Sequence, residues 1–253
     1  MKDETALLQE AYALYQAGMR GAALAVCEEI IARESHSAMA HYWAGFACLG
    51  LGRMDQAIAQ YQEAVRRDPS NAEFYFGLAG AYESRGFREG ERLRALQRAS
   101  TLAMAEWQHQ MFEGELAKAE GDYSRALTCF RQAALSAPER YEMGKEIGQV
   151  LYLMKRVSEA RDILRASVAL PTATDMTWLN LGRCEQKLGD FGAAAAAFER
   201  SLALNPYNRF ALFRLMQVSF IRGHWLRGFR ELAAFWRLFH RTVIEDKAAL
   251  VKN

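Results

Sequence analysis

Residues 175–208 read DMTWLNLGRCEQKLGDFGAAAAAFERSLALNPYN, and their spacing of small, aromatic and proline residues indicates the fold class. It has glycine at positions 8 and 15, alanine at 20, an aromatic residue at 24, a small residue at 27 and proline at 32. The second glycine permits a tight turn, because glycine adopts left-handed backbone angles without steric cost. The glycine at position 8 lets two helices approach closely, and the proline ends the second helix. The stretch therefore predicts two packed helices joined by a short turn.

The same spacing recurs along the chain at a period of 34 residues. Residues 38–71 and 107–140 match it at most anchor positions, and 72–106 fits with one extra residue. One helical pair cannot bury its own apolar face, so successive pairs must stack on one another. The 34-residue spacing predicts seven repeats, at residues 4–37, 38–71, 72–106, 107–140, 141–174, 175–208 and 209–242.

Some repeats depart from the pattern. Ser35 and His240 replace the terminal proline in the first and last repeats, Gly228 replaces the alanine at position 20, and Lys155 replaces the turn glycine. Terminal repeats are expected to be atypical because they cap the stack. Residues 243–253 have apolar residues at helical spacing, which predicts a short extra helix over the last repeat.

As a set, these anchors resemble tetratricopeptide (TPR) repeats over residues 4–242. The resemblance implies an all-α fold, a right-handed α-α superhelix of about seven helix–turn–helix units plus a short C-terminal capping helix. It also implies that residues 1–253 form a single solenoid domain.

Composition agrees with this fold class. The chain has 253 residues, of which 51% are hydrophobic and 25% charged, so it can bury a large core. No apolar run approaches the roughly 20 residues that span a bilayer, and the charged N-terminus lacks the apolar core of a secretory signal. We therefore expect a cytoplasmic protein, and the possibility that the chain is part of a longer one stays open.

The cysteines and histidines suggest packing rather than chemistry. Cys27, Cys48, Cys129 and Cys184 form no Cys-x-x-Cys pair and fall at small apolar positions of the repeats, which predicts buried thiols. His41 occupies a packing position where the repeat usually has tryptophan. No phosphate-binding loop, nucleophile elbow or zinc motif is present. We expect no enzyme activity, no cofactor and no metal site.

The family resemblance implies that the first helix of each repeat lines a concave groove, with positions 2, 5, 9 and 12 facing inward. In the first three repeats these positions carry an aromatic set, Tyr12, Tyr15, Tyr42, Phe46 and Phe76. Aromatic rings offer a large apolar contact area for a partner at modest entropic cost. The alternative is that several of them only pack against the next helix.

The later repeats offer a different set. The resemblance includes the carboxylate clamp of chaperone-binding TPR domains, and Lys145, Asn180 and Arg214 occupy three of its five places. Gln149 and Phe210 replace the other two, and Arg183 lies on the same helix face as the clamp positions. In the first three repeats the five places hold Leu8, Tyr12, Trp43, Glu73 and Gly77. A full clamp is therefore not predicted, and the two interpretations left are a weaker anion-reading patch and solvated surface charge.

Positive charge concentrates at the C-terminal end. The net charge is +2 overall, but residues 209–253 carry nine Lys and Arg against three Asp and Glu. Aromatic and apolar residues alternate there with arginines on one predicted helix. Such a helix can contact an anionic membrane, a partner helix or a second copy of the chain. The alternative is that its apolar face packs under the extra helix predicted at residues 243–253.

The leading functional hypothesis is a non-catalytic scaffold that binds a peptide segment or helix of another protein, with acidic or carboxylate character, in its groove. A second is an assembly factor of a bacterial secretion, pilus or surface-polysaccharide machine. Single-stranded RNA binding is disfavoured, because the net charge is only +2 and no basic residue recurs from repeat to repeat. No nucleic-acid partner is expected.

Overall fold

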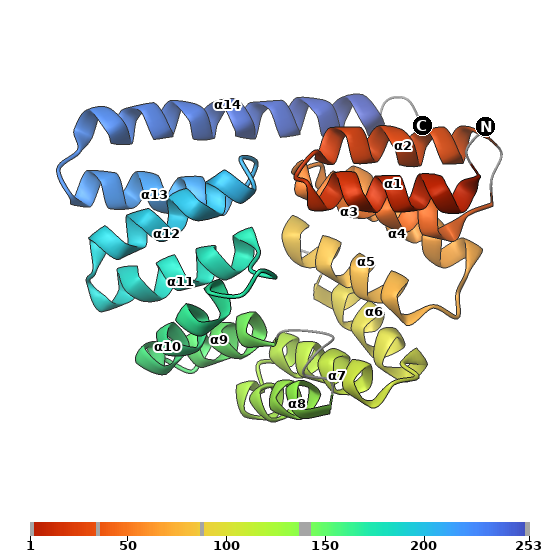
Figure 1. The fold of residues 1–253 in the computed structure, drawn as a ribbon, viewed down its shortest axis with the longest axis horizontal. Coiled ribbons are helices and arrows are strands. Elements are labelled where there is room, and N and C mark those ends of the chain that lie inside the picture. Colours follow the sequence, from red (N-terminus) through yellow and green to blue (C-terminus); the bar gives the residue numbers. More distant parts are fainter. Residues whose placement is uncertain (1–2, 34–35, 87–88, 137–142, 251–253) are drawn as a thin grey trace. The chain divides into compact units, whose positions relative to one another are not determined.

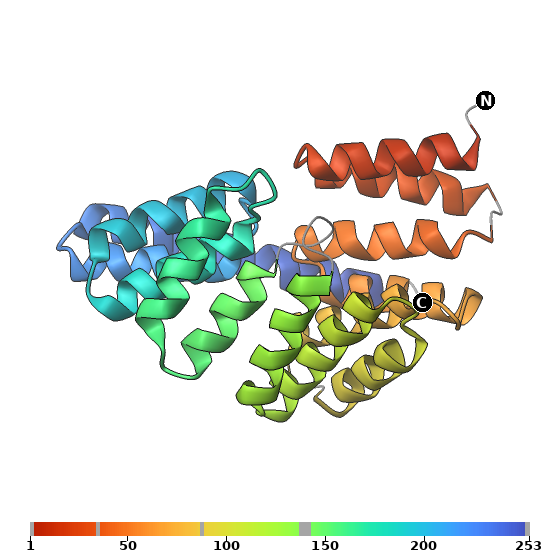
Figure 2. The ribbon, with the colours of Figure 1, turned by 60° about the horizontal axis from the view of Figure 1, so that its bottom comes forward.

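The computed structural model describes residues 3–33, 36–86, 89–136 and 143–250, with side chains as far as Arg237. All regular structure in these ranges is helical, and the helices follow one another as pairs (Figures 1 and 2). Cα packing divides the chain into two compact units, residues 1–104 with 242–253, and residues 105–241. The all-α repeat fold is confirmed, whereas a single solenoid domain over 1–253 stays a prediction.

The first unit contains three helical pairs. Each pair packs on the next through its second helix, and the first helices also contact one another. Its helices are α1 (Glu4–Gln16), α2 (Arg20–Ala32), α3 (Ala38–Gly50), α4 (Met54–Arg67), α5 (Ala72–Arg85) and α6 (Glu89–Leu102).

The second unit repeats this arrangement. The second helix of each pair again contacts the first helix of the next, and α9, α11 and α13 contact in sequence. Its helices are α7 (Glu106–Glu120), α8 (Tyr123–Ser136), α9 (Gly144–Leu153), α10 (Val157–Val168), α11 (Asp175–Leu188), α12 (Phe191–Leu204), α13 (Arg209–Ile221) and the first part of α14 (Trp225–Leu250).

The end of the chain differs from the sequence expectation. A separate capping helix was expected from residue 243, but α14 runs without interruption from Trp225 to Leu250. The physical reason is that neither glycine nor proline occurs after Gly228, so nothing stops the helix at the repeat boundary. Within the described residues, no helix combines the length and apolar character that a membrane crossing requires.

Glycine at position 8 is required by the large residue at position 24. A Cβ on Gly182 would lie 2.5 Å from the ring of Phe198, and one on Gly114 would lie 2.7 Å from Phe130. Both rings are fully buried. Such distances are far below van der Waals contact, so only glycine lets the second helix place its ring against the first. The predicted close approach of the two helices is confirmed.

The corner between repeats is fixed by the residues around the proline. Ser201 donates a hydrogen bond to the backbone oxygen of Asp175 at 2.8 Å. The amide nitrogens of Asn205 and Asn208 donate to the Asp175 carboxylate at 3.0 and 2.9 Å. The Asn208 oxygen in turn caps α13 by accepting from the Ala211 amide. The end of α12 is thereby tied to the start of its own repeat and to the start of the next.

The turn between the two helices of each pair has a residue with left-handed backbone angles at the same position. At position 15 of the repeats φ is +76° at Gly18, +84° at Gly121 and +87° at Gly189. Lys155 takes the same place with φ +65°, the one non-glycine residue with positive φ in the part of the chain that the structure describes. The departure noted in the sequence is therefore a side-chain substitution within a preserved turn.

Lys155→Gly is expected to raise the free energy of unfolding by about 1 kcal/mol, since left-handed angles cost a residue with a Cβ roughly that much. Lys155→Ala is the matched control, because it removes the charge and keeps the Cβ. Urea denaturation followed by circular dichroism measures both. Equal stability of the two variants would show that the lysine is not strained in this turn.

Candidate functional site

Five aromatic side chains of α1 and α3 form one surface cluster in the first unit, here called the aromatic surface. Tyr12 and Tyr15 contact the ring of Trp43 with centroid distances of 5.2 and 6.4 Å. Tyr42 lies 5.4 Å from Trp43 and 5.6 Å from Phe46. Tyr15 also meets Phe46 edge to face at 5.5 Å. The rings therefore form a continuous set across two neighbouring first helices.

The aromatic surface is partly exposed and partly packed. Tyr12 is 47% exposed, whereas Tyr15, Tyr42, Trp43 and Phe46 are half-buried against the core of the first unit. The rings are therefore partly packed and partly accessible to solvent, and partner binding on them stays a prediction.

Phe76 is a predicted groove residue, and Trp43 is an aromatic residue of the surface that the groove positions did not include. Phe76 lies on α5, the next first helix, and is half-buried. Sequence reasoning omitted Trp43 because it stands at position 6 rather than at the expected inward positions 5 and 9. The signal that could have found it is its size, since an indole covers the space beside positions 5 and 9.

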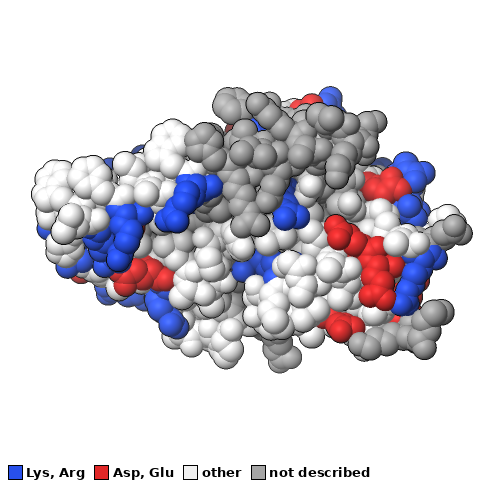
Figure 3. Space-filling view, turned by 90° about the horizontal axis from the view of Figure 1, so that it is seen from above, with Lys and Arg blue, Asp and Glu red and all other residues white. Residues whose placement is uncertain are grey.

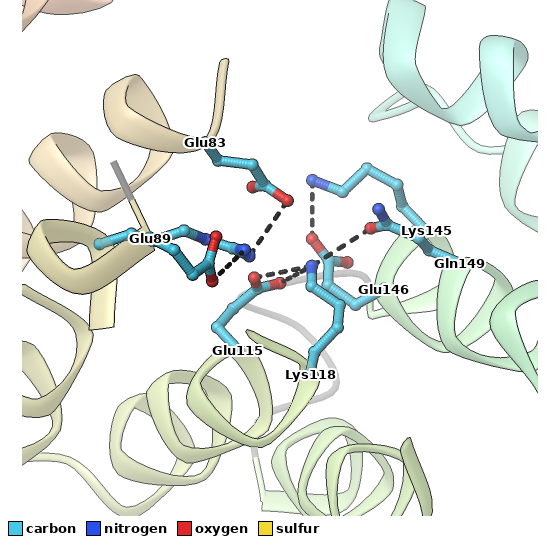
Figure 4. A network of polar contacts seen from close by, with 8 residues as sticks. Glu83, Glu89, Glu115, Lys118, Lys145, Glu146 and Gln149 are labelled. Atoms are coloured by element: carbon cyan, nitrogen blue, oxygen red, sulfur yellow. Dashed lines mark hydrogen bonds and ion pairs between the residues drawn. The ribbon is translucent and has the colours of Figure 1, made fainter. Parts of the chain in front are cut away.

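In the second unit, Lys145 and Gln149 take part in polar contacts in which each lysine is paired with a glutamate (Figure 4). Lys118 Nζ lies 2.7 Å from the Glu115 carboxylate and donates to Gln149 Oε1 at 3.3 Å. Lys145 Nζ lies 2.7 Å from Glu146, whose side chain is only 5% exposed. The acids neutralise both lysines, so Lys145 is a weaker anion ligand than its position in the sequence suggests.

Two arginines of α11 and α13 have a different environment, and they are here called the arginine pair. The Arg183 guanidinium stacks over the Tyr152 ring at 4.6 Å and donates to Asn180 Oδ1 at 3.2 Å. Arg214 donates to Gln217 Oε1 at 3.2 Å. The described residues pair neither arginine with a carboxylate. Since α11 and α13 contact one another, these two uncompensated charges lie on neighbouring helices.

Asn180 contributes less to a surface than the sequence suggests. Its side chain is buried, and its oxygen already accepts the bond from Arg183. The Asn180 oxygen therefore helps to hold the guanidinium over Tyr152, and direct contact of Asn180 with a partner stays a prediction.

The thiols and His41 are packed as expected. Burial raises the pKa of Cys27 and of Cys184 to about 12, and it raises the pKa of Cys129 as well. His41 Nδ1 lies 2.7 Å from Gln60 Oε1, and burial lowers its pKa. Among the residues that the structure describes, no group of three or more His, Cys, Asp or Glu side chains is arranged to hold a metal ion.

Family models match three parts of the chain. A model described as TPR repeat matches residues 45–86, and models described as tetratricopeptide repeat match residues 113–174 and 176–208. The matches fall in both units.

Two curated relatives share sequence with the chain. Protein CTR9 homolog from Arabidopsis thaliana is 29% identical over 146 residues, 56% of this chain. Tetratricopeptide repeat-containing protein trd-1 from Caenorhabditis elegans is 30% identical over 103 residues, 40% of this chain. The chain spans only 13% of the length of each of these relatives.

Solved structures share the fold at low sequence identity. A tetratricopeptide repeat protein from Parabacteroides merdae superposes with a TM-score of 0.63 at 12% identity, over 84% of this chain and 82% of that one. The APC/C hetero-tetramer Cut9–Hcn1 gives a TM-score of 0.61 at 16% identity, over 98% of this chain and 49% of that one. The chain is a protein-interaction scaffold that belongs to the tetratricopeptide repeat family.

Proposed function

We propose that this scaffold binds a peptide segment or helix of a partner protein on the faces of its first helices, without catalysing a reaction. The observation that carries the proposal is the aromatic surface, where Tyr12, Tyr15, Tyr42, Trp43 and Phe46 form one connected and partly exposed set. Rings held against a core lose little conformational freedom on binding.

The aromatic surface suits an apolar anchor of the partner. Each apolar Å² removed from water stabilises a complex by about 25 cal/mol, so covering the outer edges of several rings contributes a few kcal/mol. Tyrosine and tryptophan are also the residues that most often dominate binding energy at interfaces. The expected ligand of the first unit is therefore a segment with a large apolar side chain.

The arginine pair suits a carboxylate. A guanidinium forms two parallel hydrogen bonds with a carboxylate, and stacking over an aromatic ring orients the group beforehand. The pair lies in the second unit, and the proposal for it is independent of the aromatic surface. A ligand with acidic residues or a free C-terminus fits this chemistry.

Affinity capture from native lysate tests the apolar anchor. Tyr12→Ala is expected to reduce the recovery of the bound partner at least several-fold, because the ring is exposed and its loss leaves the core unchanged. Leu135→Ala is the matched control, since Leu135 is an apolar residue of α8 in the second unit and is 82% exposed. Identical sets of captured proteins for wild type and Tyr12→Ala would contradict the proposal.

Single substitutions separate the two kinds of cation. Arg214→Ala is expected to weaken binding of a captured partner about ten-fold, the effect of losing one charge-assisted hydrogen bond. Lys145→Ala is expected to change affinity little, because Glu146 already neutralises the lysine. Isothermal titration with the captured partner measures both, and equal losses for the two variants would refute the difference inferred from their ion pairs.

A further inference from the structure

The last repeat presents an outer face whose equivalents in repeats 38–71 and 175–208 pack against apolar residues of the core. Positions 17, 21 and 28 of repeat 175–208 are Phe191, Ala195 and Leu202. They pack in one cluster with three residues of α13, spaced i, i+4 and i+7 along that helix: Ala211, Leu215 and Val218. The first helix of one repeat thus covers these three positions of the repeat before it.

In repeat 209–242 the same positions hold Trp225, Phe229 and Trp236, which are 61%, 58% and 50% exposed. They fall on one stripe of α14, here called the terminal face. The corresponding residues of repeat 38–71, Ile58 and Val65, are buried and half-buried in the core of the first unit. The terminal face is therefore a stacking surface that is more exposed to solvent than the same positions of repeats 38–71 and 175–208.

Arginines border the terminal face. Arg230 and Arg237 lie beside the stripe on α14, and Arg222 lies in the turn before it. The described residues pair no carboxylate with any of these three, while Glu231, the one acid within residues 209–237, is bound by Arg227. Figure 3 shows basic side chains next to uncharged surface over the described part of α14.

We propose that the terminal face binds an acidic amphipathic α-helix of a partner protein, in the position that α13 takes on α12. The packing of α13 defines the apolar side of this helix, which needs small or medium apolar residues at i, i+4 and i+7. The unpaired arginines define its flanks, which need aspartate or glutamate.

A second copy of the chain fits the terminal face less well. The first helix of the chain carries Ala6, Glu10 and Ala13 at the three covering positions, so a head-to-tail contact would bury Glu10 against the aromatic stripe. Two terminal faces brought together would oppose arginine with arginine. An anionic membrane also offers negative charge to the arginines. It does not offer a helix with apolar residues at the spacing by which α13 packs on α12.

A fluorescein-labelled peptide with the sequence of residues 208–222, carrying Arg209→Glu, Arg214→Glu and Arg222→Glu, is the probe. It keeps Ala211, Leu215 and Val218 and contains no tryptophan. With the full chain we expect saturable anisotropy and a blue shift of protein tryptophan emission. The peptide with its native arginines, and an acidic peptide that also carries Ala211→Asp and Leu215→Asp, are each expected to bind at least ten-fold more weakly.

Protein variants locate the binding. Trp236→Gln and Arg230→Glu are each expected to weaken binding of the acidic peptide at least ten-fold. Arg230→Glu is also expected to strengthen binding of the peptide with its native arginines. Leu135→Gln, at another exposed apolar residue of the second unit, and Tyr12→Ala, on the aromatic surface, should bind like wild type. Circular dichroism melting checks that each variant is folded. Because Arg230 is exposed, its reversal keeps the test valid even where Trp236→Gln is destabilised.

Three results would overturn the proposal. The first is absence of saturable peptide binding, or binding that neither Trp236→Gln nor Arg230→Glu weakens. The second is concentration-dependent self-association in analytical ultracentrifugation that Trp236→Gln abolishes, which would assign the face to a second copy. The third is Trp236-dependent binding to phosphatidylcholine vesicles with 30% phosphatidylserine in the absence of peptide binding, which would assign it to a membrane.

Discussion

Gly182→Ala is expected to lower the free energy of unfolding by about 2 kcal/mol, although alanine is ordinarily the better helix former. The added Cβ would lie 2.5 Å from Phe198, whose ring is fully buried and cannot move aside without disturbing the pair. Urea denaturation of the full chain, followed by circular dichroism at 222 nm, measures the change.

Two comparisons show whether the clash is the cause. Gly80→Ala, in the middle of α5 with no atom within 4 Å of the new Cβ, is expected to raise stability by about 0.5–1 kcal/mol. In a Phe198→Cys background the cost of Gly182→Ala is expected to disappear, since repeat 4–37 already pairs Ala11 with Cys27 at these positions. A cost that persists in the Phe198→Cys background would rule out the ring as its source.

Lys118→Met is expected to lower the free energy of unfolding by about 3–5 kcal/mol, because it removes the cation that pairs with a buried carboxylate. The side chains of Lys118 and Glu115 are only 6% and 10% exposed, and Gln149 also loses the hydrogen bond from the ammonium. Urea denaturation again gives the value.

The double variant Lys118→Met, Glu115→Leu is expected to recover most of that loss, since replacing both ions removes the uncompensated charge. Lys145→Met serves as the control, because Lys145 is 30% exposed and water compensates for its loss in part. If Lys118→Met costs no more than Lys145→Met, burial does not set the strength of this ion pair.

The turn at Lys155 shows how far the sequence pattern reaches. The repeats before and after Lys155 keep the 34-residue spacing, so the position of the turn can be predicted from the spacing alone. The left-handed backbone at Lys155 followed from packing, because the contacts of α9 with α10 hold the turn in the geometry of its glycine counterparts. The backbone preference of a lysine alone predicts negative φ at this position, because left-handed angles are unfavourable for a residue with a Cβ.

The end of α14 shows the opposite case. The 34-residue period predicts a repeat boundary at residue 242. The helix continues across it, because no residue near that position ends a helix. Continuation of the helix followed from the absence of glycine and proline after Gly228, a local property that outweighed the repeat pattern.

For the candidate surfaces, the sequence identified the helices and faces but not the neighbours. It named Tyr12, Tyr15, Tyr42 and Phe46 from their positions and missed Trp43, because an indole reaches rings that sequence positions do not place beside it. The sequence placed Lys145 among the anion ligands, and the structure adds that its ammonium is directed at Glu146, the next residue, at 2.7 Å.

The number, order and helical character of the repeats could be predicted from the amino-acid sequence, since glycine, alanine, large apolar residues and proline at fixed spacing act within one repeat or between adjacent ones. Which charges of the described residues are paired with a carboxylate, and how far each apolar side chain is exposed, became clear from the folded chain. Those properties depend on the direction of each side chain and on the helices that pack beside it, and a repeat period carries no information about where long side chains end.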